Sequence, residues 1–139
     1  MALPGATHTG QNVVACYVNG NAFIASGHMP TGMGFFNWGD DYFIYDSLLA
    51  IEGSNWNNES IHLSIKFTGL GTYNLTQNNS QPPFAYYQDT GSAFSSINGS
   101  VTISYYDGNI LAGKFAFDGK SASGSIVHVT NGEFDIAGK

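Results

Sequence analysis

The sequence predicts an all-β fold, an antiparallel β-sandwich or flattened barrel of about eight to ten short strands joined by hairpins. Three observations predict this class. Apolar and polar residues alternate in several runs, 18 glycines are spread along the chain, and no segment shows the apolar periodicity of an amphipathic helix. Residues 1–9 read as a leader and residues 10–139 as a single β domain.

The first element is a predicted hairpin. The segment NVVACYVNGNAFIASG places Asn19-Gly20 between two apolar runs, and this dipeptide is a strong signal for a tight turn between antiparallel strands. Cys16, the only cysteine, lies inside the first run. Its apolar neighbours predict that it packs in the core, and an internal disulfide is excluded.

The middle of the chain predicts five more strands. Residues 42–52 read as two strands broken near Asp46-Ser47, with a short helix as the alternative. SIHLSIKF alternates cleanly, which is typical of a half-buried strand. GTYNLT follows a glycine-rich bend, and FAYYQD is entered through Pro82-Pro83, whose missing N–H groups mark a strand boundary.

The last third predicts a run of hairpins. Asp107-Gly108 and Asn131-Gly132 are both interpreted as tight turns, and Asp118-Gly119 as the start of a connection. In the final strand Phe134 and Ile136 are expected on one face, with Glu133 and Asp135 on the other.

Charge excludes several classes of partner. The chain has a net charge of −6, four lysines and no arginine. Binding to nucleic acid or to an anionic membrane surface needs cationic side chains, so both are disfavoured. No apolar run approaches the roughly 18 residues of a membrane span. Cations and neutral molecules such as glycans remain as ligands.

The segment NWGDDYFIYD gathers acids and aromatic residues. Asp40, Asp41 and Asp46 are candidate oxygen ligands for Ca²⁺, although their spacing is not that of an EF-hand loop. The main interpretation is that they are exposed turn residues. No cofactor is otherwise expected.

Exposed aromatic rings are the candidate ligand-binding feature. Trp38, Tyr42, Tyr45 and Trp56 are predicted to form a platform for a glycan or another neutral ligand, since rings with polar tips tolerate water. The alternative is that these rings fill the core and cover the ends of the fold.

Motifs for catalysis are weak. The histidines lack the spacing of a zinc motif, although a surface pair of His62 and His128 is conceivable. The GxSxG motif is absent from any strand–turn–helix context. The carboxylate pair of a glycosidase is an alternative that no spacing supports. The sequence therefore predicts a non-enzymatic protein.

Several ordered segments resemble one family. LPGATHTGQNVVACYVNGNAF, FTGLGTYNLT and GSVTISYYDGNILAGKFAF…IVHVTNGEFDI are similar to the opening, middle and end of small uncharacterised lipoproteins of Bacteroidota. The resemblance implies an exported protein at the periplasm or cell surface, held by a lipid anchor in its native precursor. It implies no activity and no site residues.

These observations give two functional hypotheses. The first is a non-enzymatic cell-envelope or surface lipoprotein domain that binds a glycan or another neutral ligand through exposed aromatic residues. The alternative is a structural or assembly subunit that uses β-strand edges to build a surface complex or filament with a protein partner.

Overall fold

The computed structural model describes residues 13–25, 40–55, 59–75 and 82–137. This part of the chain is all-β, as predicted. Its ten strands are β1 (Val13–Val18), β2 (Asn21–Ala25), β3 (Asp40–Tyr45), β4 (Leu48–Ser54), β5 (Ser60–Lys66), β6 (Gly71–Asn74), β7 (Phe84–Gln88), β8 (Ala93–Tyr106), β9 (Ile110–Lys120) and β10 (Ile126–Ala137). The predicted leader, residues 1–9, lies outside the described residues.

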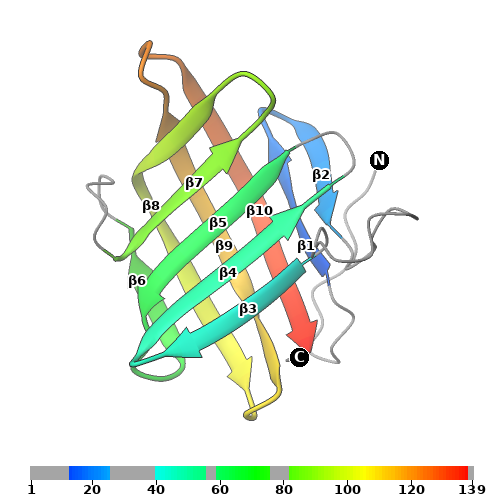
Figure 1. Ribbon diagram of the computed structural model, residues 1–139, viewed down its shortest axis with the longest axis vertical. Helices are drawn as coiled ribbons and strands as arrows, with labels where there is room; N and C mark the ends of the chain where they lie inside the picture. Colours follow the sequence, from blue (N-terminus) through cyan, green and yellow to red (C-terminus); the bar gives the residue numbers. More distant parts are fainter. Residues whose placement is uncertain (1–12, 26–39, 56–58, 76–81, 138–139) are drawn as a thin grey trace.

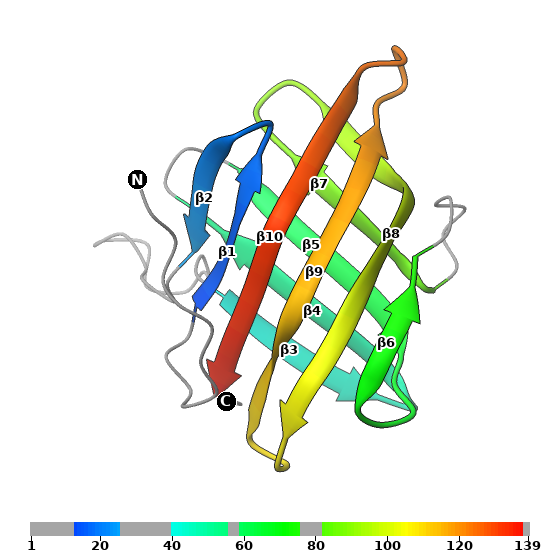
Figure 2. The same cartoon turned by 180° about the vertical axis from the view of Figure 1, so that it is seen from behind.

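The strands form one antiparallel sheet that curls into a half-barrel. Their order is β2-β1-β10-β9-β8-β7-β5-β4-β3, and β6 pairs with β8 beside this path. Strands β3, β4, β5 and β7 make one layer, which crosses in front of the layer of β2, β1, β10, β9 and β8 (Figures 1 and 2). The long strand β8 joins the layers, because it pairs with β7 of the front layer through residues 93–95 and with β9 of the back layer through residues 95–106.

Two of the tight turns follow directly from local sequence. Asn19 and Gly20 have φ values of 49° and 84°, and Asp46 and Ser47 have φ values of 51° and 69°. Positive φ at both central residues defines the two-residue turn that matches the twist of antiparallel strands. The prediction of two strands broken at Asp46-Ser47 is therefore confirmed, and the helical alternative is wrong.

Three local predictions differ from the structure. Asn131-Gly132 is not a turn, because β10 continues through both residues with a shift in its register against β9. Asp118-Gly119 lies inside β9, and the chain reverses at residues 121–125 instead. The turn predicted at Asp107-Gly108 has Gly108 and Asn109 as its central residues instead, because Asp107 N donates to Ile110 O. Of these two residues only Gly108 has positive φ.

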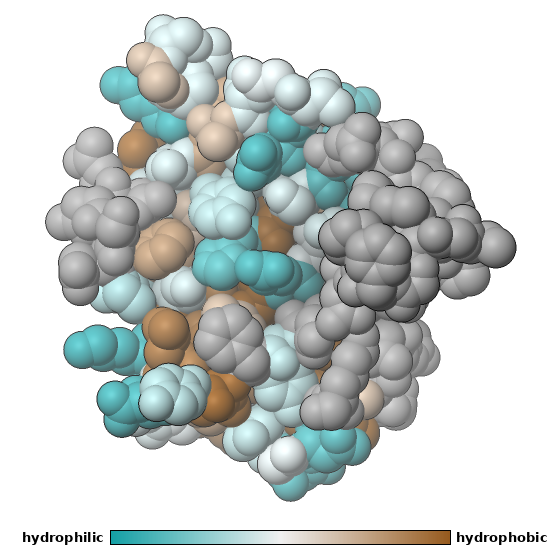
Figure 3. Space-filling view, in the orientation of Figure 1, coloured by the Kyte–Doolittle hydropathy of each residue, from teal (hydrophilic) through white to brown (hydrophobic). Residues whose placement is uncertain are grey.

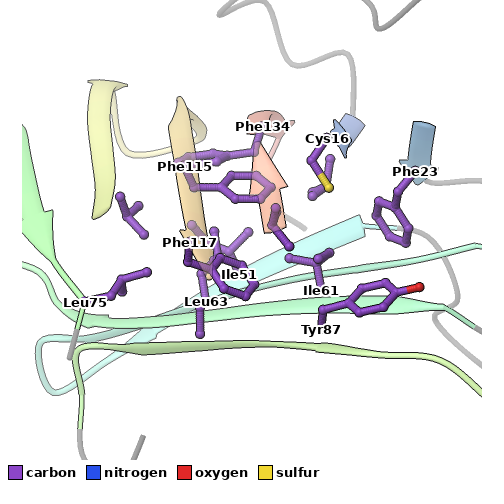
Figure 4. Close-up of a cluster of buried hydrophobic side chains, with 14 of the residues drawn as sticks. Cys16, Phe23, Ile51, Ile61, Leu63, Leu75, Tyr87, Phe115, Phe117 and Phe134 are labelled. Carbon is purple, nitrogen blue, oxygen red and sulfur yellow. The ribbon is translucent and has the colours of Figure 1, made fainter. Parts of the chain in front are cut away.

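The core lies between the two layers (Figure 4). In β5 alternate residues point inward, and Ile61, Leu63 and Ile65 are each 1% exposed. Rings of Phe115 and Phe134 stack beside one another with centroids 6.3 Å apart. Burial of these side chains is the main source of stability, since each contributes roughly 1.5–3 kcal/mol when removed from water.

Gly53 sets the distance between the layers at one point. A Cβ atom at this position would lie 2.8 Å from Cβ of Val14 and 3.2 Å from Cβ of Ala25. Strand β4 of the front layer therefore approaches β1 and β2 of the back layer more closely than a side chain allows.

Aromatic side chains close the lower end of the half-barrel. Tyr42 of β3 donates a hydrogen bond of 2.5 Å from its hydroxyl to the carbonyl of Asn109, in the β8–β9 turn. Its ring meets Tyr106 edge-on, and Tyr106 meets Phe67 in the same way. These contacts join the front layer to the back layer at this end.

Candidate functional site

The upper end of the half-barrel carries a cleft of about 350 Å³. It lies where the β1–β2, β7–β8 and β9–β10 turns come together (Figures 1 and 2). Its size is at the lower limit of the 300–1,000 Å³ typical of small-molecule sites. We call it the end cleft.

The end cleft has an apolar floor and a polar rim. Tyr87 and Phe94 are buried and lie with ring centroids 6.0 Å apart and planes at 31°. The remaining floor and rim residues are Val18, Val127, Ile126, Asn19, Asn21, Glu59, Asp89 and Ser125. An apolar base with a few polar groups around it is the usual anatomy of a ligand pocket.

Hydrogen bonds fix the carboxylate of Glu59 at this rim. Asn55 Nδ2 donates to Glu59 Oε1 at 2.8 Å, and the Tyr87 hydroxyl donates to Glu59 Oε2 at 2.5 Å. The amide of Glu59 donates in turn to Oδ1 of Asn55 at 3.1 Å. The ends of the β4–β5 connection thus hold one carboxylate in a single orientation, tied to the floor by Tyr87.

Asp89 is the second acid of the rim. Its Oδ1 accepts hydrogen bonds from the amides of Gly91 and Ser92, each at 2.9 Å. This is an Asx turn, a local arrangement that aspartate and asparagine side chains favour. The two amides share one carboxylate oxygen, a role that the side-chain oxygen of an asparagine can also fill.

The acids shape the electrostatics of the cleft and the core beneath it. The pKa of Tyr87 is raised chiefly by burial, then by its hydrogen bond to Glu59 and by the charges of Glu59 and Asp89. Burial, with a contribution from Glu59, also raises the pKa of the Cys16 thiol to about 12. Figure 4 shows the Tyr87 hydroxyl pointing away from the middle of the core cluster, on the side where Phe23 lies. Cys16 is buried in the core, as predicted.

A second hollow of about 430 Å³ lies beside the start of β8 and the end of β9. Its lining includes the exposed residues Ala93, Lys120 and Ala122. Apart from Ile97 and Lys120, its lining consists of alanine and serine side chains, which offer little apolar surface to a ligand. The end cleft, with its buried rings, is therefore the better candidate.

Of the four aromatic residues predicted to bind ligand, the structure describes Tyr42 and Tyr45, which lie three residues apart on β3. Tyr42 is half-buried and packs against the core at the lower end. Tyr45, which ends β3, is 76% exposed. Trp38 and Trp56 lie outside the described residues. The role of these residues in binding stays a prediction.

Strand β3 separates the three acids proposed for calcium. The backbones of Asp40 and Asp41 begin β3, whereas Asp46 follows its last residue in an exposed turn. A strand rises about 3.3 Å per residue, so roughly 16–20 Å of chain separates Asp46 from the other two. The structure does not bring all three acids around one point. Among the described residues, no group of three or more His, Cys, Asp or Glu side chains is placed to hold a metal ion.

An unexpected hydrogen-bonded chain lies on the outer face of the front layer, a face of mixed polarity (Figure 3). His62 Nδ1 lies 3.0 Å from Glu52 Oε1, and His62 Nε2 lies 3.0 Å from Ser64 Oγ. The Tyr86 ring stacks on the imidazole with centroids 4.9 Å apart. The bond to His62 lowers the pKa of Glu52.

This order of groups is that of a serine hydrolase, but its surroundings are not. Ser64 is only 4% exposed. Strand β5 is paired with β4 on one side and β7 on the other at this residue. Backbone amides within such a ladder are engaged with neighbouring strands, so the sheet presents no oxyanion donors here. The chain is best explained as cross-strand side-chain pairing.

His62 and His128 do not share a site. His128 lies on β10 and its Nδ1 is 2.7 Å from Asp118 Oδ1 on β9. Each histidine thus has a carboxylate on the neighbouring strand as its partner.

Sequence reasoning did not single out the end cleft. Its residues come from five separate segments, and only the Asn19-Gly20 turn and the Asp89 turn carry a local signal. Tyr86 and Tyr87 are consecutive residues of β7 and so point to opposite faces of the sheet, Tyr87 inward.

Comparison with protein-family models matches residues 42–136 to a family described as a domain of unknown function, DUF6252. No curated protein and no solved structure matches the chain. The described residues contain no helix with the length and apolar character to cross a membrane.

Proposed function

The chain belongs to the DUF6252 family, and we propose that it is a non-enzymatic binding domain whose end cleft holds a small polar ligand, a glycan in the first instance. The observation that carries this proposal is the cleft itself. Tyr87 and Phe94 give it a buried aromatic floor, and the carboxylate of Glu59 is held in place above them.

The chemistry of the cleft suits a sugar. Carboxylate and amide oxygens accept hydrogen bonds from hydroxyl groups, and asparagine Nδ2 groups donate to them. Tyr87 and Phe94 are 4% and 8% exposed, so they give the cleft a small apolar surface against which the C–H groups of a sugar can pack. The preorganised Glu59 loses little conformational freedom on binding, which favours affinity.

The proposal includes a place in the cell. The resemblance of the opening, middle and closing segments to Bacteroidota lipoproteins supports an exported, lipid-anchored protein at the periplasm or cell surface. The low content of charged residues, 10%, is typical of secreted β-proteins. Membrane fractionation of the native full-length precursor, with and without the lipid-modification step, tests this part.

A glycan array followed by calorimetry tests the binding proposal. Asn21→Ala removes an exposed rim amide, whereas Asn74→Ala removes an exposed amide from β6, outside the cleft. We expect a glycan hit whose Kd rises about threefold to tenfold in Asn21→Ala and is unchanged in Asn74→Ala. An equal effect of both substitutions, or no hit, contradicts the proposal.

Assembly through sheet edges is the second candidate. Strands β2 and β3 stand at the two ends of the strand order, so each pairs on one side only within the described sheet. An edge strand offers backbone groups to another chain. Sedimentation over rising protein concentration tests this candidate: polymers support it, and a monomer at every concentration argues against it.

A further inference from the structure

We infer that the ligand of the end cleft carries a protonated amine, so that an amino sugar fits the cleft better than a neutral sugar. This inference rests on the proposed function and narrows its ligand class. It is carried by the juxtaposition of two carboxylates, Glu59 and Asp89, over a floor of two aromatic rings.

The charge of the lining has one sign. Glu59 and Asp89 are the ionisable carboxyl groups of the cleft, and its described lining contains no lysine or histidine. The chain as a whole has a net charge of −6 and no arginine. A cationic ligand is therefore attracted both by the cleft and by the surrounding molecule, whereas an anionic ligand is repelled.

The hydrogen-bonding groups of the rim also favour an ammonium group. An ammonium group offers three N–H donors and no acceptor, so it needs oxygen atoms around it. Glu59 is already oriented by Asn55 and Tyr87, and the Asp89 turn occupies Oδ1. Hydrogen bonds between an ammonium group and a carboxylate are about twice as strong as those between neutral groups.

The floor supplies the second half of the recognition. Tyr87 and Phe94 are tilted toward one another with centroids 6.0 Å apart, and both line the cleft. Both rings are largely buried, at 4% and 8% exposed, so the floor offers a small apolar surface beside the rim and not an open ring face. An amino sugar joins an apolar ring face and a cationic substituent in one small molecule, which matches floor and rim together.

A metal ion matches the same charge less well. Calcium takes six to eight oxygen ligands, and no group of three or more potential ligand side chains gathers among the described residues. An ammonium group needs fewer oxygen partners and tolerates their spacing better.

Calorimetric titration with four probes tests the inference. Glucosamine, N-acetylglucosamine and glucose share one ring and differ at one substituent, and 1,5-diaminopentane carries the ammonium group without a sugar. At about pH 6 the amines are protonated. We expect glucosamine to bind at least about tenfold more tightly than the two neutral sugars, with a Kd that rises with salt. If the diamine binds more tightly than glucosamine, the cleft recognises the ammonium group and not the sugar ring, and the assignment of an amino sugar is overturned.

Two charge-neutral variants and a matched control locate the effect. Glu59→Gln and Asp89→Asn keep the shape of each side chain and remove one charge each. Asp89→Asn keeps an oxygen acceptor for its turn, and in Glu59→Gln the Tyr87 hydroxyl can accept from the new amide while Asn55 donates to the remaining oxygen. Asp107→Asn removes the same charge from an equivalent turn, since Asp107 Oδ1 also accepts two backbone amides, from Asn109 and Ile110. We expect the Kd for glucosamine to rise about threefold to tenfold in the two cleft variants and to be unchanged in Asp107→Asn.

The outcomes separate this inference from the proposal on which it rests. A neutral glycan that binds at the cleft as tightly as glucosamine overturns the inference and leaves the proposed function standing. An equal rise of the Kd for glucosamine in Asp89→Asn and Asp107→Asn also overturns the inference, because it shows an effect of net charge and not of the cleft. A titration in which calcium displaces glucosamine at equal concentration contradicts the preference for an ammonium group. If no probe and no glycan binds, both statements fail.

Discussion

The hydroxyl of Tyr87 donates a 2.5 Å hydrogen bond to Oε2 of Glu59 and so ties the floor of the end cleft to its rim. Tyr87 is 4% exposed and belongs to the core, whereas Glu59 is half-buried at the edge of the fold. This single contact couples the stability of the domain to the geometry of its candidate site.

Tyr87→Phe is expected to destabilise the protein by about 1–2 kcal/mol, because it removes a hydrogen bond to a charged group while keeping the buried ring. Tyr105→Phe is the control, since Tyr105 also donates to a carboxylate, that of Asp107, but at an exposed turn. Urea unfolding measures both. If Tyr105→Phe lowers the free energy of unfolding as much as Tyr87→Phe does, the special role of the Tyr87 hydrogen bond is contradicted.

Gly53→Ala tests the close approach of the layers. A methyl group there meets Val14 and Ala25 side chains from the opposite layer, and overpacking of this kind typically costs about 1–3 kcal/mol. Gly91→Ala places the same methyl group in open space, at a position without a positive φ value. Thermal unfolding is expected to separate the two variants; equal melting temperatures contradict the packing between β4 and β1.

Cys16 is expected to resist alkylation in the folded protein. Burial raises the pKa of its thiol to about 12, and the thiolate is the reactive form. At about pH 8 iodoacetamide therefore modifies Cys16 only as fast as the domain opens, and modification becomes rapid in urea. Mass spectrometry follows the reaction. Rapid labelling without denaturant is inconsistent with this core.

Glu52 and Glu133 are expected to shift stability with pH in opposite directions. The pKa of Glu52 is lowered by its bond to His62, so its contribution is present above the ordinary carboxyl range and is lost as pH falls below about 4. The pKa of Glu133 is raised by burial, although Lys114 lowers it in part. Its Oε1 is buried and accepts no hydrogen bond from the described part of the chain.

Substitution of each glutamate by glutamine tests the direction of its effect on stability. Glu52→Gln is expected to reduce stability near neutral pH by less than about 1 kcal/mol, as for an exposed pair, and the difference disappears in acid. Glu133→Gln is expected to increase stability near neutral pH, because it removes a poorly solvated charge, and this gain also disappears in acid. Urea titrations from about pH 3 to pH 7 measure both. The same sign for both variants contradicts the assignment.

The fold was predictable where local chemistry decides it. Alternation in SIHLSIKF placed Ile61, Leu63 and Ile65 inside, and the turn residues Asn19-Gly20 and Asp46-Ser47 were found from their sequence alone. The same reasoning failed at Asn131-Gly132. There the left-handed residue Asn131 serves a bulge within a long strand, and a bulge and a turn use the same residue types.

The candidate site was not predictable, because its residues meet only through the curl of the sheet. Asn19, Glu59, Asp89 and Phe94 belong to different strands and turns, and no local pattern links them. Clustering of aromatic residues in the sequence pointed to Tyr42, which instead closes the lower end through its bond to Asn109. A cluster of aromatic residues in the sequence does not indicate at which end of a curled sheet each ring will lie.

Mapping of amide chemical shifts during titration with a glycan hit tests the central claim most directly. The account predicts that shifts concentrate at the end cleft, in the amides of Asn19, Tyr87, Asp89, Phe94 and Val127. Shifts concentrated instead around Tyr42 and Tyr45 at the lower end, or along the edge strands β2 and β3, contradict it.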